Sequence, residues 1–280
     1  MSGSGASIWE RVSPVDERRL ELLEASVWSQ LQRLVAPAFR NRFGVSVLSD
    51  DLGVRIRGSR TRDLSLNRVY ALGIRSPLTI AQLEALVTDY ADNDASRFMI
   101  SWAPIAQPTA ARGWFEERGF RRIRSIARLT RRTADDVFVE NQLSVVDATA
   151  ADSKEFGALA ARGNGLAPEY AEGFNSTIGL PGWRHYFALD AHRPVSAAAL
   201  YVDGDYAWAG LAGTLPDDRR RGAQSALLAR RIRDAHIAGA EWITCETTAD
   251  SPDRPNQSLR NMKRLGFDVT YELENYVLDL

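Results

Sequence analysis

Residues 216–228 read Pro-Asp-Asp-Arg-Arg-Arg-Gly-Ala-Gln-Ser-Ala-Leu-Leu, and these residue types at this spacing suit the binding of an anion. Residues 206–215 before them are apolar and strand-like, and the residues after them have helical periodicity. The turn therefore lies at a helix N-terminus, where unpaired backbone N–H groups and the positive end of the helix dipole attract negative charge. Gly222 allows close approach of the backbone, and residues 219–221 are all arginine. We expect this turn to cradle a pyrophosphate.

The cradle does not match the common nucleotide-binding motifs. It contains neither G-x-x-x-x-G-K-[ST] nor G-x-G-x-x-G, which disfavours a P-loop or a dinucleotide-binding fold. It resembles motif A of the GNAT superfamily of acetyl-CoA-dependent N-acetyltransferases, which is written [QR]-x-x-G-x-[GA]. Arg219 takes the first place, Gly222 the glycine place, and Gln224 stands where Gly or Ala is commoner. The alternative interpretation is a basic helix N-terminus on a solvated face.

The rest of the C-terminal half follows the order of elements in the GNAT core. The expected elements are a helix over 220–239, a strand over 241–248, a loop over 250–256, a short helix over 258–265 and a last strand over 269–280. Residues 256–267 resemble motif B of the family, which typically has Asn, a short helix and then Tyr-x-x-x-Gly-Phe. Met262 occupies the place of that Tyr, which in the family often protonates the departing CoA thiolate.

The resemblance implies that acetyl-CoA is the acetyl donor and that no metal is needed. In GNAT enzymes the pantetheine arm lies in a wedge between two splayed strands and pairs with exposed backbone. The residues that the resemblance assigns to the cofactor are Gly213, Thr214 and Leu215 for this pairing, Arg219, Arg220, Arg221, Gly222, Ala223, Gln224, Ser225 and Ala226 for the pyrophosphate, and Asn256 for the cofactor arm.

The attacking amine must lose a proton, so an acceptor is needed near the splay. Glu246 is the first candidate for the catalytic base because it lies on the strand that lines the wedge, where desolvation raises the pKa of a carboxylate. Alternatively, Glu246 points to solvent or pairs with an Arg of the neighbouring helix. With Met262 unable to donate a proton, water, Tyr271 or Tyr276 is left to protonate the thiolate.

A short helix over 168–174 stands where GNAT enzymes usually shape the acceptor pocket. The candidate substrate residues are Glu169 and Tyr170 on this helix, and Tyr186 on a following strand. Tyr186, Tyr206 and Trp208 each face either the pocket or the core, because the sequence does not fix the parity of a strand.

Internal repetition is visible when the ends of the two halves are compared. Residues 113–120 and the strand over 122–129 parallel residues 261–267 and the strand over 269–278, each pair being a short helix, Gly-Phe and an alternating strand. In the first half the strand over 66–74 enters its helix without R-x-x-G-x-[GA]. The first half therefore resembles a degenerate GNAT core, and only the second half is expected to hold CoA.

These patterns predict an α/β fold with a mixed, mostly antiparallel central sheet flanked by helices, made of two GNAT-like halves. The N-terminal segment over 14–39 has the apolar spacing of an amphipathic helix, and residues 45–48 and 54–57 suggest a hairpin. We place a degenerate domain at 1–138 and the acetyltransferase domain at 139–280.

Composition sets limits on the class of protein. A chain of 280 residues suits two domains, and 45% hydrophobic residues can fill two cores. The formal net charge of −1 gives no global field for nucleic acid or an anionic membrane. The single Cys245 excludes an internal disulfide and fits a reducing cytoplasm, three scattered histidines lack metal-ligand spacing, and residues 1–7 lack the apolar core of a signal peptide.

Two functions from different classes follow. The first is an acetyl-CoA-dependent N-acetyltransferase acting on a small amine or on an exposed peptide or protein amine. Such an enzyme could act as a homodimer. The second is a non-catalytic acyl-CoA-binding or scaffolding module, which Met262 and the first half without a cradle both motivate. Nucleic-acid binding through the arginines of 118–132 is disfavoured by the near-neutral charge.

Overall fold

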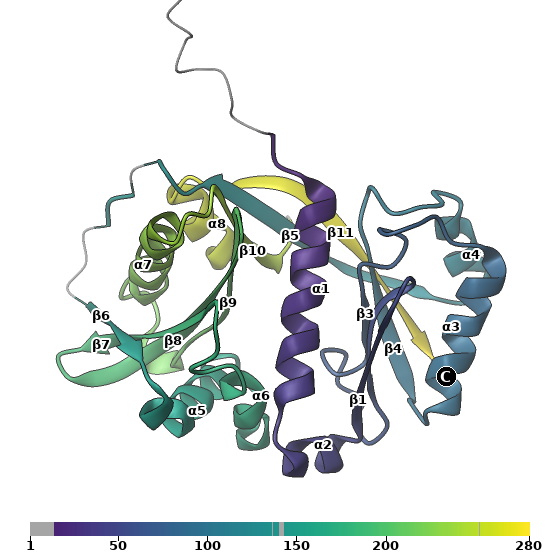
Figure 1. Cartoon of the computed structure of the whole chain (residues 1–280), viewed down its shortest axis with the longest axis horizontal. Coiled ribbons are helices and arrows are strands. Elements are labelled where there is room, and N and C mark those ends of the chain that lie inside the picture. Colours follow the sequence, from purple (N-terminus) through teal and green to yellow (C-terminus); the bar gives the residue numbers. More distant parts are fainter. Residues whose placement is uncertain (1–13, 136, 140–142, 252) are drawn as a thin grey trace, which may run out of the picture.

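The computed structural model describes residues 14–135, 137–139, 143–251 and 253–280. The described part forms an 11-stranded sheet in the order β1-β2-β3-β4-β11-β5-β10-β9-β8-β7-β6, with helices packed against it (Figure 1). Most neighbouring strands are antiparallel, and β3–β4 and β9–β10 are parallel. The predicted α/β fold with a mixed, mostly antiparallel sheet is confirmed. No helix in the described ranges combines the length and the apolar character needed to cross a membrane. Residues 1–7, expected to lack a signal peptide, lie outside the described residues.

The helices and strands follow the expected order in both halves. In the first half they are α1 (Glu17–Leu34), α2 (Pro37–Phe43), β1 (Val45–Asp50), β2 (Gly53–Gly58), β3 (Arg68–Tyr70), α3 (Ile80–Asp92), β4 (Arg97–Trp102), α4 (Ala111–Glu117) and β5 (Arg121–Arg132). In the second half they are β6 (Ser144–Ala148), α5 (Ser153–Gly163), α6 (Ala171–Asn175), β7 (Trp183–Asp190), β8 (Arg193–Asp203), β9 (Tyr206–Thr214), α7 (Ala223–Ile237), β10 (Trp242–Thr248), α8 (Gln257–Arg264) and β11 (Asp268–Asp279). Single 3₁₀ turns lie at η1 (Ala150–Asp152), η2 (Pro168–Tyr170) and η3 (Pro216–Asp218).

The last strand of each half is exchanged with the other half. Strand β5 pairs with β10 and β11, and β11 pairs with β5 and β4. Both sheet neighbours of β5 therefore come from the second half, and both neighbours of β11 come from the first. The two strands run as long teal and yellow ribbons across the middle of the molecule (Figure 1). The two sequence halves consequently share one continuous sheet. The domain boundary between residues 138 and 139 remains a prediction.

Two expected elements are shorter in the structure than their patterns suggest. The helix expected over 14–39 ends at Leu34, and a second helix starts at Pro37, because proline disfavours helical backbone at the residue before it and suits the first helical position. The strand expected over 66–74 covers only Arg68–Tyr70, since Ala71 and Gly73 turn the chain with positive φ of 54° and 70°.

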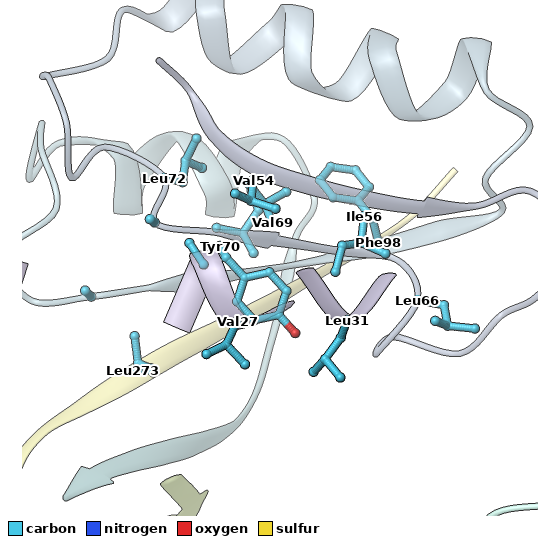
Figure 2. Packing of buried hydrophobic residues seen from close by; sticks show 14 of the residues in the cluster. Val27, Leu31, Val54, Ile56, Leu66, Val69, Tyr70, Leu72, Phe98 and Leu273 are labelled. Carbon is cyan, nitrogen blue, oxygen red and sulfur yellow. The ribbon is translucent and has the colours of Figure 1, made fainter. Parts of the chain in front are cut away.

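Helix α1 lies between the two groups of elements and packs on both (Figure 1). Its apolar side contributes Val27 and Leu31 to a core that also contains Val54, Ile56, Val69 and Phe98 of the first half (Figure 2). Leu273 of the exchanged strand β11 joins the same core and is 1% exposed. Burial of apolar side chains from both halves therefore holds α1 in place.

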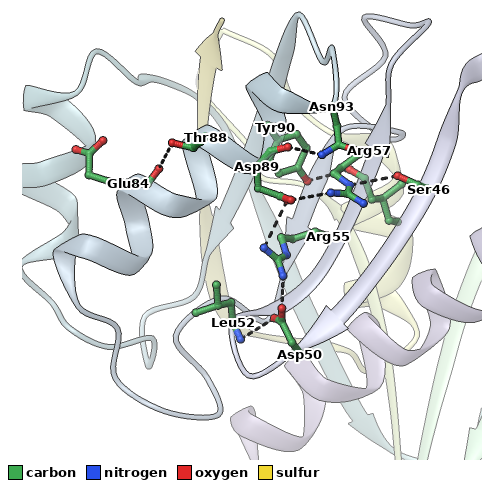
Figure 3. Close-up of polar contacts among 11 residues, drawn as sticks. Ser46, Asp50, Leu52, Arg55, Arg57, Glu84, Thr88, Asp89, Tyr90 and Asn93 are labelled. Atoms are coloured by element: carbon green, nitrogen blue, oxygen red, sulfur yellow. Dashed lines mark hydrogen bonds and ion pairs between the residues drawn. The ribbon is translucent and has the colours of Figure 1, made fainter.

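Charged groups fasten helix α3 to the outer strands of the first half (Figure 3). Asp89 accepts hydrogen bonds from Arg57 at 2.7 Å and from Arg55 at 3.5 Å, and Arg55 also pairs with Asp50. The hydroxyl of Tyr90, on the same helix, donates to the carbonyl of Ile56 at 2.9 Å. These contacts fix the periphery of the first half and lie away from the cavities described below.

Strands β9 and β10 separate along their length, and this splay creates the site. They pair only at Tyr206–Trp242, Ala207–Ile243 and Trp208–Thr244, although β9 continues to Thr214 and β10 to Thr248. The register of β9 against β8 shifts at a bulge, and Leu211 there has a positive φ of 49°. A bulge bends its strand, which accounts for the departure of β9 from β10.

Candidate active site

The turn before α7 presents the N-terminus of that helix. Arg220 and Gly222 both have positive φ, of 64° and 83°, and Gly222 is the N-cap, which offers no side chain to cap the helix. The amide of Ala226 already donates to the carbonyl of Gly222 at 3.0 Å. The first N–H groups of a helix lack intrahelical partners, so those of residues 223–225 form a potential anion-binding site in front of the turn.

The corresponding helix of the first half is closed by its own side chains. Thr79 and Gln82 form a capping box at the start of α3, with N–H to oxygen distances of 2.9 and 3.2 Å. The amide of Gln107 also donates to the carbonyl of Gly73 in the preceding turn. The start of α3 is thus capped by side chains, whereas no side chain caps the start of α7.

A cavity of about 1010 Å³ lies in front of the α7 turn, between β9, α8 and the end of α5. The candidate cofactor residues that line it are Gly213, Thr214, Arg219, Arg220, Gly222, Ala223, Gln224, Ser225 and Asn256. Gly163 lies directly against this part of β9. A Cβ atom on residue 163 would lie only 2.6 Å from the amide nitrogen of Thr214. The end of α5 therefore supports the open end of β9.

Three candidate cofactor residues are placed elsewhere, which corrects the sequence interpretation. The amide of Leu215 donates to the carbonyl of Val195, and the amide of Ala226 is used within α7, so neither N–H is open to a ligand. Arg221 turns to acidic partners, with its Nη2 2.8 Å from Asp190 and its Nη1 3.1 Å from Asp218. None of the three lines the cavity.

Asn256 lines the cavity, but its side chain is already engaged. Its Oδ1 accepts from the amides of Ser258 and Leu259 at the start of α8, and its Nδ2 donates to Thr247 and Thr248 at 2.9 and 2.6 Å. An amide group has two donors and an acceptor oxygen with two lone pairs, so this set is complete. Asn256 therefore positions α8 against the end of β10, rather than offering its side chain to the cofactor arm as the sequence suggested.

The charges around this cavity fit a phosphate-bearing ligand. Among the described residues that line it are Arg219, Arg220, Arg231 and Arg264 and a single acid, Asp218. Nη2 and Nη1 of Arg193 donate to the two carboxylate oxygens of Asp218 at 2.7 and 2.9 Å, and these hydrogen bonds hold the pKa of that carboxyl below its usual range. Because Asp218 is neutralised by its partners, the cavity keeps an excess of positive charge.

A second cavity of about 500 Å³ adjoins the first. The two cavities share Asn164, Ala212, Gln224, Arg231 and Ser258. Tyr170 lines the second cavity as expected, whereas Glu169 is outside its lining and pairs with Arg42 at 3.1 Å. Tyr186 is also outside, which corrects its assignment: its strand parity turns it toward α7, where its hydroxyl donates to Asp234 at 2.8 Å.

Glu246 lines the second cavity, and its side chain is 19% exposed. Burial raises its pKa to about 7, and the nearby charge of Glu24 acts in the same direction. Nη1 of Arg128 lies 3.5 Å from Glu246 Oε2, which has no hydrogen-bond partner among the described residues. The Arg beside Glu246 thus comes from the neighbouring strand, not from the neighbouring helix.

Glu246 belongs to a buried group of charges at the junction of the two halves. Arg128 of β5 also contacts Glu24 at 2.6 Å and Glu21 at 3.3 Å, both from α1. The charge of Arg68 on β3 lowers the pKa of Glu246, opposing the acidic neighbours. We call Glu21, Glu24, Glu246, Arg68 and Arg128 the junction cluster. It contains three carboxylates and two guanidinium groups, so one further positive charge would balance the charges of the cluster.

Other side chains take roles that differ from the expectations. Tyr271 donates to Glu21 at 2.7 Å and Tyr276 to Glu274 at 3.2 Å, and neither lines a cavity, so neither is placed to protonate a thiolate.

Met262 does line the second cavity. Burial raises the pKa of the Cys245 thiol to about 12, which keeps it protonated and unreactive.

Sequence reasoning missed Arg231, which lines both cavities. It is buried, and burial lowers its pKa to about 10. Its Nε and Nη1 donate to the carbonyls of Leu227, Ala199 and Gly210, so it braces the bulged strands beside the splay. An Arg among the apolar positions of residues 227–235 was the available signal.

Solved structures share this architecture. A GCN5-related N-acetyltransferase from Kribbella flavida aligns with a TM-score of 0.62 and 19% identity over 92% of this chain and 95% of that one. One from Sphaerobacter thermophilus aligns at 0.59 and 14% over 84% and 76%, and a tandem GNAT protein from the clavulanic acid biosynthesis pathway at 0.53 and 14% over 76% and 74%. No family model and no curated protein matches the sequence. At these identities the likeness establishes the fold, and this chain has the fold of the GCN5-related N-acetyltransferases.

Proposed function

We propose that this protein transfers an acetyl group from acetyl-CoA to a primary amine. The observation that carries the proposal is the meeting of two cavities at the β9–β10 splay, one rich in Arg and one containing the half-buried Glu246. Two substrates held in adjoining cavities react as one complex, and such positioning supplies a large part of the rate of a two-substrate transfer.

The residues of the first cavity would hold the donor. When bound, acetyl-CoA supplies the acetyl group as an activated thioester. The backbone N–H groups of residues 223–225 and the guanidinium groups of Arg219 and Arg220 would bind its phosphates, because both are donors in a cationic setting. Gly213 and Thr214 border the open side of β9 and would contact the pantetheine arm.

Glu246 would accept the proton of the amine. The junction cluster lacks one positive charge, which a proton on Glu246 or the ammonium group of a substrate can provide. A pKa of about 7 lets Glu246 change between the two forms near neutral pH, which is the range in which a general base works best. Because Tyr271 and Tyr276 are engaged elsewhere, the thiol product takes its proton from water or leaves as the thiolate.

The proposal is tested by mixing the purified protein with acetyl-CoA and a panel of primary amines and measuring thiol release. Thiol release that depends on both the protein and the amine is the expected result. The alternative is a non-catalytic acyl-CoA-binding module, favoured by Met262 in the cavity lining where the family has Tyr. Tight acetyl-CoA binding without thiol release for any amine would support that alternative and reject the transferase.

CoA should bind once per chain, and Gly222→Asp should abolish that binding. The substitution puts a side chain and a negative charge at the N-cap of α7, where the phosphates are proposed to bind. Calorimetry with CoA measures both the affinity and the number of sites.

Gly239→Asp is the matched control for this prediction. Gly239 lies just after the other end of α7, has a positive φ of 89° like Gly222, and faces open space, so it imposes a similar backbone cost away from the cavity. CoA binding should survive this change. Two sites in the unmodified chain, or equal losses in the two variants, would contradict the prediction.

A further inference from the structure

The second cavity is built from both halves of the chain. The first half contributes Trp28, Gln32, Phe39, Asp63 and Leu66 to its lining. The half without a cofactor cradle therefore supplies one side of the wall against which the acceptor would rest. Helix α1 packs directly on β9, and the exchanged strands join the two halves in one sheet around the splay.

Most of this wall is aromatic and apolar. Phe39 and Tyr170 face each other in an edge-to-face contact with ring centroids 6.4 Å apart. The indole N–H groups of Trp28 and Trp208 both donate to Glu24, which leaves the indole rings as apolar surface. Flat apolar walls around a small cavity favour a compact ligand body that is itself apolar or aromatic.

Three polar side chains of the wall, Gln32, Asp63 and Glu246, offer hydrogen-bond acceptors. Glu246 Oε2 and Gln32 Oε1 have no hydrogen-bond partner among the described residues, and Gln32 is 4% exposed. Asp63 adds a further carboxylate to the lining, and its Oδ1 accepts hydrogen bonds from the amide and the hydroxyl of Ser65. Among the described lining residues Arg231 is the sole cation, and its Nε and Nη1 already donate to carbonyls.

We infer that the acceptor is a small primary amine with a compact apolar body and without a carboxylate, and that the first half of the chain selects it. The inference rests on the proposed function, because it assigns the acceptor of the same site. An ammonium group provides N–H donors for these acceptors, and its positive charge balances two carboxylates that share the lining with the single Arg231. The carboxylate of an amino acid would meet Asp63 and Glu246 with the same sign of charge, which disfavours its binding.

The test is the binding of three probes to the full chain saturated with CoA, measured by calorimetry at pH 8. 2-Phenylethylamine has the amine and the apolar body, L-phenylalanine adds only a carboxylate, and ethylamine keeps the amine without the ring. We expect 2-phenylethylamine to bind at least about tenfold more tightly than either of the others. Equal or weaker binding of 2-phenylethylamine relative to either probe would overturn the inference.

The role of the first half is tested with Asp63→Asn, which keeps the shape of the side chain and removes its charge. We expect this variant to bind 2-phenylethylamine about tenfold more weakly and CoA as before, since Asp63 lines only the second cavity. Asp92→Asn, an exposed acid on α3, should change neither affinity. Unchanged binding of 2-phenylethylamine to Asp63→Asn would reject the selecting role of the first half.

These binding measurements separate the two proposals. If 2-phenylethylamine binds with the expected preference but no amine of the panel causes thiol release, the transferase proposal fails and the ligand class stands. If thiol release is faster with L-phenylalanine, the transferase stands and the ligand class is wrong.

Discussion

Glu246→Gln should lower the turnover number by about 10²-fold or more while leaving the affinity for acetyl-CoA nearly unchanged. Glutamine keeps the shape of the side chain and cannot accept the proton of the amine. Glu246 lines only the second cavity, so the donor site is untouched. Steady-state thiol release gives the turnover, and calorimetry with CoA gives the affinity. Glu241→Gln, an exposed acid close to the start of β10, serves as the control and should behave as the unmodified protein.

The pH dependence gives an independent reading of the same residue. The base must be deprotonated, and burial raises its pKa to about 7, so kcat/KM of the unmodified protein should fall as the pH drops through about 7. This inflection should be absent in Glu246→Gln, and the deficit of the variant should shrink at high pH, where more of the amine is already neutral. A variant that loses acceptor affinity while keeping its turnover would show that Glu246 binds the substrate cation without transferring a proton.

Residues 142–280 expressed alone should aggregate or fail to fold. In this fragment β11 loses β4 and β5, which are both of its sheet neighbours, and β10 loses β5. Leu273, Tyr276 and Val277 of β11, all at most 2% exposed in the intact protein, would face water. A long unpaired strand with apolar side chains is a template for aggregation. Size-exclusion chromatography and circular dichroism of the fragment measure this outcome.

Coexpression with residues 1–138 is the matched control for the fragment. The two pieces together contain every strand of the shared sheet, so they should form a soluble complex that elutes as one species. A monomeric fragment 142–280 that unfolds cooperatively and releases thiol as fast as the intact chain would contradict the prediction. It would also show that the first half does not shape the acceptor pocket.

The sequence was sufficient for those parts of the site that depend on local backbone chemistry. The Gly222 turn needs a positive φ and leads into a helix of the expected period, and both features can be recognised from neighbouring residues. Thr79 and Gln82 have the T-x-x-Q spacing of a capping box, a further local signal that the sequence interpretation did not use and that the structure revealed. Helix and strand order follows from hydrophobic periodicity, which reports local conformation directly.

The side chains whose direction was misjudged depend on strand parity and on partners distant in the chain. Tyr186 points to α7, a direction that a one-residue shift in strand register would reverse. Arg221, in the turn before α7, is turned away from the cavity by Asp190 at the end of β7. Asn256 has the type and position of a cofactor ligand, yet the end of β10 supplies partners for both of its donors. Hydrogen bonds of this kind become visible only when the elements are packed together.

The sequence by itself determined the kind of fold, the position of the cradle and the candidate base, because each rests on residues close together in the chain. Only the tertiary structure decided that the halves exchange their last strands, which brings Arg128 of β5 beside Glu246. It also decided that Glu24 lies against Arg128 and that Asp63 lines the second cavity. The pairing of strands that are far apart in sequence depends on burial and on register across the whole sheet, and neither leaves a pattern in a short stretch of residues.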